Sequence, residues 1–227
     1  MLLCIPDVLA FDDLSQLRNA VLSAEWEDGR ATGGSHSALV KKNRQLPASS
    51  RAALRAGEAI LDALTRSELF ISAALPLRIL PPMFNRYSSE EHFGPHVDGS
   101  IRRPGNSYVH IRTDLSATLF LSNPEDYDGG ELTIETAFGA QAVKLPAGHL
   151  VLYPASSLHR VTPVTRGERV ASFFWIQSMI RDNEKRSILF DLDQCIQRLK
   201  VERGMEDQEC LSLSNIYHNL IRQWAET

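Results

Sequence analysis

The residues best suited to chemistry are His96 and Asp98, one residue apart, and the distant His159 and Arg169. Two imidazoles and one carboxylate can occupy one face of an octahedral metal ion, which leaves three positions open. This set of donors is typical of non-heme iron(II) centres that bind O₂ and a substrate together. We therefore predict that His96, Asp98 and His159 bind one iron(II) ion.

The spacing of these residues suits β-strands. Side chains alternate along an extended strand, so His96 and Asp98 would lie on the same face, and the third ligand must come from another strand. Arg169 lies ten residues beyond His159, enough for a strand, a turn and a return strand. A guanidinium there can bind the carboxylate of a cosubstrate through two parallel hydrogen bonds.

The surrounding segments give weight to a motif that is weak alone. Residues 84–98 read as a strand, a polar loop and then the metal pair. Residues 148–161 read as a turn glycine, a strand, a proline and a short loop that delivers His159 to the next strand. Arg169 then opens the apolar strand 169–176.

In these motifs the chain resembles the iron(II)/2-oxoglutarate dioxygenases of the prolyl and lysyl hydroxylase branch, and specifically the bacterial PKHD-type hydroxylases. The resemblance covers residues near 80 to 178, and the length and layout also fit. It implies that decarboxylation of 2-oxoglutarate to succinate is coupled to hydroxylation of a substrate by O₂, with L-ascorbate as an accessory reductant. It requires no catalytic residue beyond the metal ligands, and it gives Arg169 the far carboxylate of 2-oxoglutarate.

The resemblance also suggests roles for two aromatic residues. Tyr87 would hydrogen-bond to 2-oxoglutarate, and its alternative is a core tyrosine with a satisfied hydroxyl. Trp175 would wall the iron pocket, since its even spacing from Arg169 puts both on one strand face, and its alternative is core packing. Leu119 and Phe120 stand where some prolyl hydroxylases place another tyrosine, so one cosubstrate contact has no residue.

Other polar residues are weaker candidates. His149 competes only weakly as a ligand, and His92 is close enough to His96 to reach over the pocket. The basic cluster of Arg102, Arg103 and Arg112 is more typical of a solvated face, with binding of an anionic substrate as its alternative. Arg160 and Arg166 are the other possible partners for a cosubstrate carboxylate.

Composition excludes several classes of protein. The 227 residues, with 43% hydrophobic and 23% charged, are ordinary for a globular chain. A net charge of −4 gives no footprint for nucleic acid, and no apolar run is long enough to span a membrane. Three cysteines do not form a disulfide framework and suit a reducing compartment. We therefore expect a cytoplasmic protein with no nucleic-acid or membrane partner.

The pattern along the chain divides into three parts. Residues 1–77 form an N-terminal helical support region, residues 78–178 the dioxygenase core, and residues 179–227 a helical C-terminal module. The middle part alternates with period two between turn signals, which indicates a sandwich or barrel. Together with the metal motif, this predicts a mainly β fold with flanking α: a double-stranded β-helix (jelly roll) with the N-terminal helices packed outside.

Helix signals are readable at both ends. Asp12 or Asp13 is expected to cap a first helix, and Ser49 or Ser50 a second, with a surface loop over residues 29–37 between them. The expected apolar positions are Leu14, Leu17 and Val21 in the first helix, Leu54, Leu61 and Leu64 in the second, Ile188, Leu189, Leu192, Ile196 and Leu199 in a third, and Leu213, Ile216, Tyr217, Leu220 and Trp224 in a fourth. Self-association through the C-terminal module is one way to bury the last set.

The prime substrate is not encoded in any motif, and a peptidyl prolyl or lysyl side chain, a peptide or a small molecule all fit. The resemblance suggests a setting in iron uptake. One alternative to an enzyme is a non-catalytic sensor or interaction protein that binds iron or 2-oxoglutarate on the same fold. Another is a cupin-like isomerase or hydrolase with a different metal, in which Arg169 has no required role.

Overall fold

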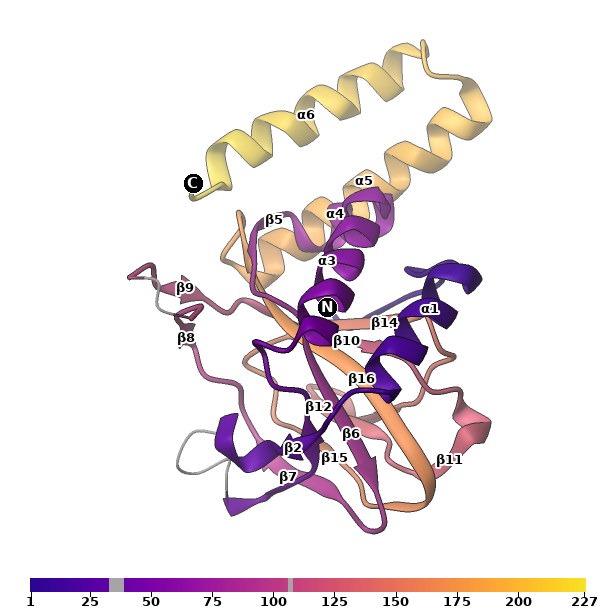
Figure 1. Ribbon diagram of the computed structural model, residues 1–227. Helices are drawn as coiled ribbons and strands as arrows, with labels where there is room; N and C mark the ends of the chain where they lie inside the picture. The colour runs from indigo at the N-terminus through magenta and orange to yellow at the C-terminus, as the bar shows by residue number, and fades with distance from the viewer. Residues whose placement is uncertain (33–38, 106–107) are drawn as a thin grey trace.

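Two antiparallel β-sheets form the jelly-roll core of the computed structural model, which describes residues 1–32, 39–105 and 108–227 (Figure 1). The larger sheet has the order β1 (Leu3–Ile5), β14 (Leu150–Pro154), β10 (Leu115–Phe120), β16 (Val164–Ser178), β6 (Met83–Ser88), β4 (Arg44–Gln45) and β2 (Glu27–Asp28), with β5 (Pro76–Ile79) and β11 (Tyr127–Gly129) also paired to β16. The smaller sheet has the order β13 (Gly139–Val143), β12 (Leu132–Thr136), β15 (His159–Val161), β7 (His92–His96) and β3 (Lys41–Lys42). This is the mainly β fold predicted from the alternating pattern.

Alternation along the larger sheet separates an apolar outer face from a more polar inner face. On β10, Leu115 and Leu119 pack in the main hydrophobic cluster with residues of the helices, whereas Ser116 and Thr118 line a cavity inside the jelly roll. On β16, Ile176 packs in the main hydrophobic cluster and Trp175 lines the same cavity. Period two therefore decides which side chains can take part in chemistry.

Three helices cover the outer face: α1 (Phe11–Leu22), α3 (Arg51–Arg66) and α4 (Glu68–Ala74). Ser50 caps α3 as predicted, because its hydroxyl accepts a hydrogen bond from the amide of Ala53. The prediction that Asp12 or Asp13 caps α1 was wrong. Ala10 holds the cap position without a side-chain bond, and both aspartates lie in the first turn, where they favour the helix dipole.

The buried face of α3 differs from the predicted stripe. Leu64 is buried, but Leu54 is 54% exposed. The residues that face the sheet are mostly small: Ala53, Ala56, Gly57, Ile60, Ala63 and Leu64. Small side chains let the helix approach the sheet closely, so hydrophobicity alone points to the wrong edge of this face.

The N-terminal 77 residues contribute strands as well as helices. β1 extends the larger sheet beside β14, and the adjacent strands β3 and β4 pair with β7 and β6. Residues 41–45 therefore pass from one sheet to the other beside the cavity. Of the expected surface loop, Gly29–Thr32 form a 3-10 turn (η1) and residues 33–37 lie outside the described residues. A second such turn, η2, spans Pro124–Asp126.

Two strand boundaries near the site differ from the sequence pattern. β7 ends at His96, so Asp98 follows the strand instead of lying on it. β16 begins at Val164, so Arg169 lies inside a long strand and does not open it. Close pairing with β11 allows this early start: Gly129, opposite Val164, has a φ of 70°, and a Cβ there would lie 2.0 Å from the carbonyl oxygen of Pro163.

The C-terminal residues form α5 (Asn183–Arg203) and α6 (Gln208–Trp224), a hairpin that extends beyond the sheets at the top of Figure 1. Phe190 joins the main hydrophobic cluster, and Leu189 packs with Leu75, Ile180 and residues of α6. Ile188 was expected on the buried stripe but is 53% exposed. Leu189 and Ile196 of the predicted stripe are buried as expected, and Phe190 is buried in place of Ile188.

β8 (Ile101–Arg102) and β9 (Ile111–Arg112) form a separate two-stranded ribbon, which lies below the hairpin at the left of Figure 1. The ribbon directly follows Asp98 in sequence, so its position is tied to the metal pair. No helix in the described residues is long and apolar enough to cross a membrane.

Candidate metal centre

His96 and His159 face each other across neighbouring strands. They are paired in the register of β7 and β15, and their ring centroids lie 4.2 Å apart. Phe93 stacks on the ring of His96 at 3.6 Å, and Tyr153 meets the ring of His159 edge-on at 5.2 Å. Aromatic walls therefore fix both imidazole planes before any ligand binds.

Backbone carbonyls fix the tautomer of each histidine. Nδ1 of His96 lies 2.8 Å from the carbonyl oxygen of Gly94, and Nδ1 of His159 lies 3.0 Å from that of Ser157. A carbonyl can only accept a hydrogen bond, so each Nδ1 carries the hydrogen. This leaves the lone pair of each Nε2 for a metal ion, the usual arrangement around protein-bound metals.

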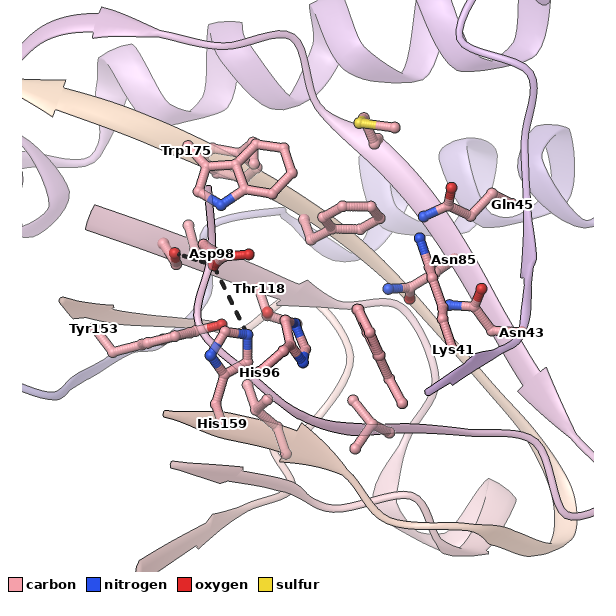
Figure 2. Close-up of a pocket in the computed structure, with 18 of the residues that line it drawn as sticks. Lys41, Asn43, Gln45, Asn85, His96, Asp98, Thr118, Tyr153, His159 and Trp175 are labelled. Atoms are coloured by element: carbon pink, nitrogen blue, oxygen red, sulfur yellow. Dashed lines mark hydrogen bonds and ion pairs between the residues drawn. The ribbon is translucent and has the colours of Figure 1, made fainter. Parts of the chain in front are cut away.

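Asp98 completes the cluster from the segment after β7. Its Oδ2 lies 3.7 Å from Nε2 of His159 and accepts a hydrogen bond of 2.6 Å from the hydroxyl of Ser116. One donor atom from each of His96, Asp98 and His159 lies within 4.8 Å of the others, and no other such cluster occurs among the described residues. Figure 2 shows the three side chains pointing toward one another.

Burial keeps the centre suited to a cation. The pKa of His96 is lowered to about 4, first by burial and then by the neighbouring His159. Protonation of either imidazole would block its lone pair, and a low pKa keeps His96 neutral at physiological pH. The donor set of two neutral imidazoles and one carboxylate matches the chemistry of an iron(II) site.

Ser116→Ala is expected to weaken binding of Mn²⁺, a stable stand-in for iron(II), by about tenfold or more, since bonds that orient a metal ligand typically matter at that level. Isothermal titration with Mn²⁺ measures the effect. Ser178→Ala is the matched control, because this buried hydroxyl bonds the carbonyl of Leu75 far from Asp98. Equal Mn²⁺ affinity in both variants would show that Ser116 does not position the carboxylate.

Arg169 is buried beside the centre without an anionic partner. It is 1% exposed and packs over the rings of Tyr87 and Phe120, with its guanidinium carbon 5.4 and 5.2 Å from the centroids. Its Nη1 donates one long hydrogen bond of 3.5 Å to Asn85, and its Nε has no partner. None of the ion pairs among the described residues includes Arg169.

A buried charge of this kind costs several kcal/mol unless it is paired, on the order of the penalty for any desolvated ion. Arg169 lines the same cavity as the three metal-ligating candidates. The residues therefore fit a dianionic keto acid, with one end at the metal and the other carboxylate at Arg169. Phe120, which lies where some prolyl hydroxylases have a tyrosine, packs against the guanidinium of Arg169.

Tyr87 and Trp175, the two aromatic candidates, also line this cavity. Tyr87 is 1% exposed, and burial raises its pKa to about 12, so its phenol stays protonated and can donate a hydrogen bond. Trp175 is 6% exposed and its ring is covered by the guanidinium of Arg102 at 3.5 Å. The two residues stand at different places on the inner face, Tyr87 on β6 beside Arg169 and Trp175 beside Ser116 on β10.

The weaker candidates lie away from the centre. Arg160 pairs with Glu135, and Arg166 with Asp128, so neither is available to a cosubstrate. Arg112 pairs with Asp114 and Glu226, as expected of a solvated face. His92, His149 and Arg103 are not among the residues that line the cavity. Of the basic cluster, Arg102 alone reaches it.

The sequence pattern missed several residues of the cavity: Lys41, Asn43, Asn85, Ser116, Thr118 and Tyr153. Ser116 and Thr118 left a signal, since they are polar and evenly spaced in an otherwise apolar strand. Tyr153 lies on β14 opposite Ser116, and burial raises its pKa well above the ordinary value. Lys41 and Asn43 left no signal, because only long-range strand pairing brings them to the site.

The cavity between the sheets is small, about 90 Å³. Figure 2 shows Lys41, Asn43 and Asn85 on the side away from Asp98 and Trp175. The pKa of Lys41 is lowered to about 8, first by burial and then by the positive charge of Arg102. The cavity thus contains the metal-ligating candidates together with three cationic side chains, Lys41, Arg102 and Arg169.

Comparison with known proteins places this geometry in a family context. Residues 82–177 match the model of the 2OG-Fe(II) oxygenase superfamily, and residues 183–226 match the PKHD-type hydroxylase C-terminal domain. A PKHD-type hydroxylase of Methylobacillus flagellatus is 58% identical over 227 residues, covering 100% of both chains. Another from Burkholderia thailandensis is 57% identical over 226 residues, again covering 100% of both.

Solved structures share the fold at low identity. A prolyl hydroxylase of Trichoplax adhaerens, in complex with a hypoxia inducible factor peptide, aligns with a TM-score of 0.56 at 15% identity, covering 83% of this chain and 86% of that one. A 2OG-Fe(II) oxygenase family oxidoreductase of Burkholderia pseudomallei aligns with a TM-score of 0.54 at 16% identity, covering 80% and 86%. HygX of Streptomyces hygroscopicus, with nickel, 2-oxoglutarate and hygromycin B bound, aligns with a TM-score of 0.50 at 17% identity, covering 76% and 81%.

Proposed function

Because the chain belongs to the PKHD-type hydroxylases of the 2OG-Fe(II) oxygenase superfamily, and so is a 2-oxoglutarate-dependent dioxygenase, we propose that His96, Asp98 and His159 hold its iron(II). The two imidazoles present Nε2 and the aspartate presents a carboxylate oxygen oriented by Ser116. When bound, iron(II) supplies the O₂ activation that couples decarboxylation of 2-oxoglutarate to substrate hydroxylation. The protein supplies the donor set and a largely buried cavity.

The observation that carries this proposal is the buried Arg169, without an anionic partner, in the cavity that holds the metal-ligating cluster. Its guanidinium binds the distal carboxylate of 2-oxoglutarate, and Tyr87 donates a hydrogen bond beside it. Tyr87, Phe120 and Tyr153 exclude water around the pair, which strengthens the charge interaction. No separate catalytic residue is required.

Turnover of 2-oxoglutarate without added prime substrate tests the proposal. The full chain with iron(II), 2-oxoglutarate and O₂ is expected to release succinate slowly, and L-ascorbate is expected to prolong the reaction as an accessory reductant. Sensors and interaction proteins that bind the same molecules release none. Absence of succinate, with iron and 2-oxoglutarate both bound, would favour the non-catalytic alternative.

A cupin-like isomerase or hydrolase with another metal is less well supported, because Arg169 has no role in such an enzyme. The prime substrate is a peptide side chain or a small molecule, and the shared fold alone does not choose between them. We place the enzyme in the cytoplasm, in the setting of iron uptake, without a nucleic-acid or membrane partner. Growth under iron limitation, with and without the protein, tests that setting.

We also propose self-association through the C-terminal hairpin. Val201 and Met205, at the α5 end and the connection to α6, are 88% and 74% exposed. A mass above that of one chain is expected in light scattering, and Val201→Glu with Met205→Glu should return it to one chain. Phe138→Glu, at a 96% exposed site on the β12–β13 turn, is the matched control. A wild-type mass of one chain contradicts the proposal.

A further inference from the structure

The cavity carries more positive charge than iron and 2-oxoglutarate need. Among the described residues that line it, Asp98 is the one carboxylate, whereas Lys41, Arg102 and Arg169 are cations. Iron(II), Asp98, the dianion of 2-oxoglutarate and Arg169 together are neutral. Arg102 then adds a positive charge that these groups do not balance, and Lys41 raises the positive potential of the same cavity.

Arg102 is held ready to bind an anion. Its guanidinium lies over the ring of Trp175, with the guanidinium carbon 3.5 Å from the ring centroid, and its buried Nε has no hydrogen-bond partner among the described residues. None of the ion pairs in the described ranges includes Arg102. A guanidinium stacked by its face keeps its N–H edge free for a carboxylate.

The neighbouring strand offers an internal contrast. Arg112 of β9, on the same ribbon as Arg102, is satisfied by Asp114 at 2.7 Å and Glu226 at 3.0 Å. Arg102 lines the cavity, and in the part of the chain that the structure describes it has no acid at ion-pair distance, although the charge of Asp98 acts on it from farther away. Lys41 is 6% exposed and lies on β3 of the smaller sheet, where it adds to the positive potential of the cavity. The charge of Arg102 helps to lower the pKa of Lys41, so the two cations lie near each other.

Apolar side chains complete the lining. Met83, Phe93, Phe173 and Trp175 border the space, and Phe173 meets Trp175 edge-on at 5.6 Å. An anionic group at Arg102 would thus be accompanied by an apolar body against the aromatic walls.

Building on the proposed function, we propose that the prime substrate carries a carboxylate, bound by Arg102, next to an apolar body. The carboxylate can come from a free acid or from an acidic side chain in a peptide. Either source meets the same guanidinium edge, and Lys41 strengthens the attraction by its charge. Arg102 is then a specificity-determining residue of the hydroxylase.

The test uses the full chain loaded with Mn²⁺ and 2-oxoglutarate, without O₂, so that no turnover occurs. Two acids, 3-phenylpropionate and a blocked glutamyl-phenylalanine peptide, are titrated by calorimetry and compared with their neutral amide counterparts. At least one acid is expected to bind, and at least about tenfold more tightly than its amide, since charge-assisted pairs contribute on that order. The acid that binds identifies the source.

Arg102→Gln should remove this preference, whereas Arg103→Gln, the matched change at an exposed neighbour, should keep it. Equal binding of acid and amide, no binding of either acid, or an unchanged preference in Arg102→Gln would overturn the inference. A control titration of Mn²⁺ and 2-oxoglutarate is run first without acid, and the protein must bind both; if it does not, the proposed function itself is contradicted.

The same titration is then repeated with acid present. If the acid displaces 2-oxoglutarate, the two molecules share one site, which contradicts a separate subsite at Arg102.

Discussion

Asp98→Ala is expected to abolish iron(II) binding and 2-oxoglutarate turnover. The substitution removes the one anionic donor of the cluster and leaves two neutral imidazoles, which cannot neutralise a divalent cation in a buried site. It also leaves the hydroxyl of Ser116 without its acceptor. The loss of iron(II) affinity should exceed that of any other single substitution considered, because the change removes both the negative charge and one ligand atom.

Metal titration and succinate release measure this effect side by side. Asp128→Ala is the control, since it removes a surface carboxylate paired with Arg166 and should leave both quantities unchanged. Thermal unfolding of the apoprotein shows whether Asp98→Ala is folded. A folded variant that binds iron(II) with the wild-type affinity would exclude Asp98 as a ligand.

Arg169→Met is expected to weaken 2-oxoglutarate binding by roughly 2–5 kcal/mol, the usual range for losing one partner of a buried charge pair. This corresponds to roughly 30-fold to 4,000-fold in affinity. Arg169→Lys should fall between wild type and Met, because a lysine keeps the charge but loses the planar pair of donors. Binding is measured by titrating 2-oxoglutarate into the Mn²⁺-loaded protein.

A second measurement separates binding from folding. Arg169 is a buried charge without an ion-pair partner, so its replacement by an apolar side chain of similar length should leave the apoprotein no less stable. Arg160→Met and Arg166→Met are the controls, because both residues lie in surface ion pairs. If Arg169→Met binds 2-oxoglutarate with unchanged affinity while Arg160→Met or Arg166→Met binds it more weakly, then the carboxylate is bound by that surface arginine and not by Arg169.

The sequence was sufficient for the jelly-roll fold, the family and the cluster of His96, Asp98 and His159. Local rules explain this success, because strand alternation places Arg169 and Trp175 on one face, and the histidines begin or end short strands. The loop position of Asp98 was not predictable from alternation. It depends on where β7 stops pairing, which is set by the partner strand and not by the residues themselves.

The errors have a common physical cause. Capping of α1 was assigned to Asp12 or Asp13, but the cap depends on the backbone angles of Ala10. The α3 prediction failed at Leu54, because close packing favoured small side chains there, and the α5 prediction failed at Ile188, where Phe190 is buried instead, although Leu189 and Ile196 are buried as predicted. Each outcome is decided by what an element packs against, information that a local pattern does not hold.

Residues 41–45 show most clearly that a local pattern cannot predict tertiary contacts. Lys41 and Asn43 reach the cavity because β3 and β4 pair with β7 and β6, whose paired residues lie 40 to 52 positions away in sequence. A Lys-Lys-Asn-Arg run suggests a solvated segment when taken alone. Only the tertiary pairing turns one of these lysines into a buried neighbour of the centre.

The most direct test of the central claim is the visible absorption of the full chain titrated without O₂, first with iron(II) and then with 2-oxoglutarate. A keto acid chelated to iron(II) gives a charge-transfer band that neither component gives alone. The account predicts this band, saturating at one iron and one 2-oxoglutarate per chain, with His96, Asp98, His159 and Arg169 intact. Absence of the band in folded wild-type protein that has bound both molecules would show that they occupy separate places, and would contradict a shared centre.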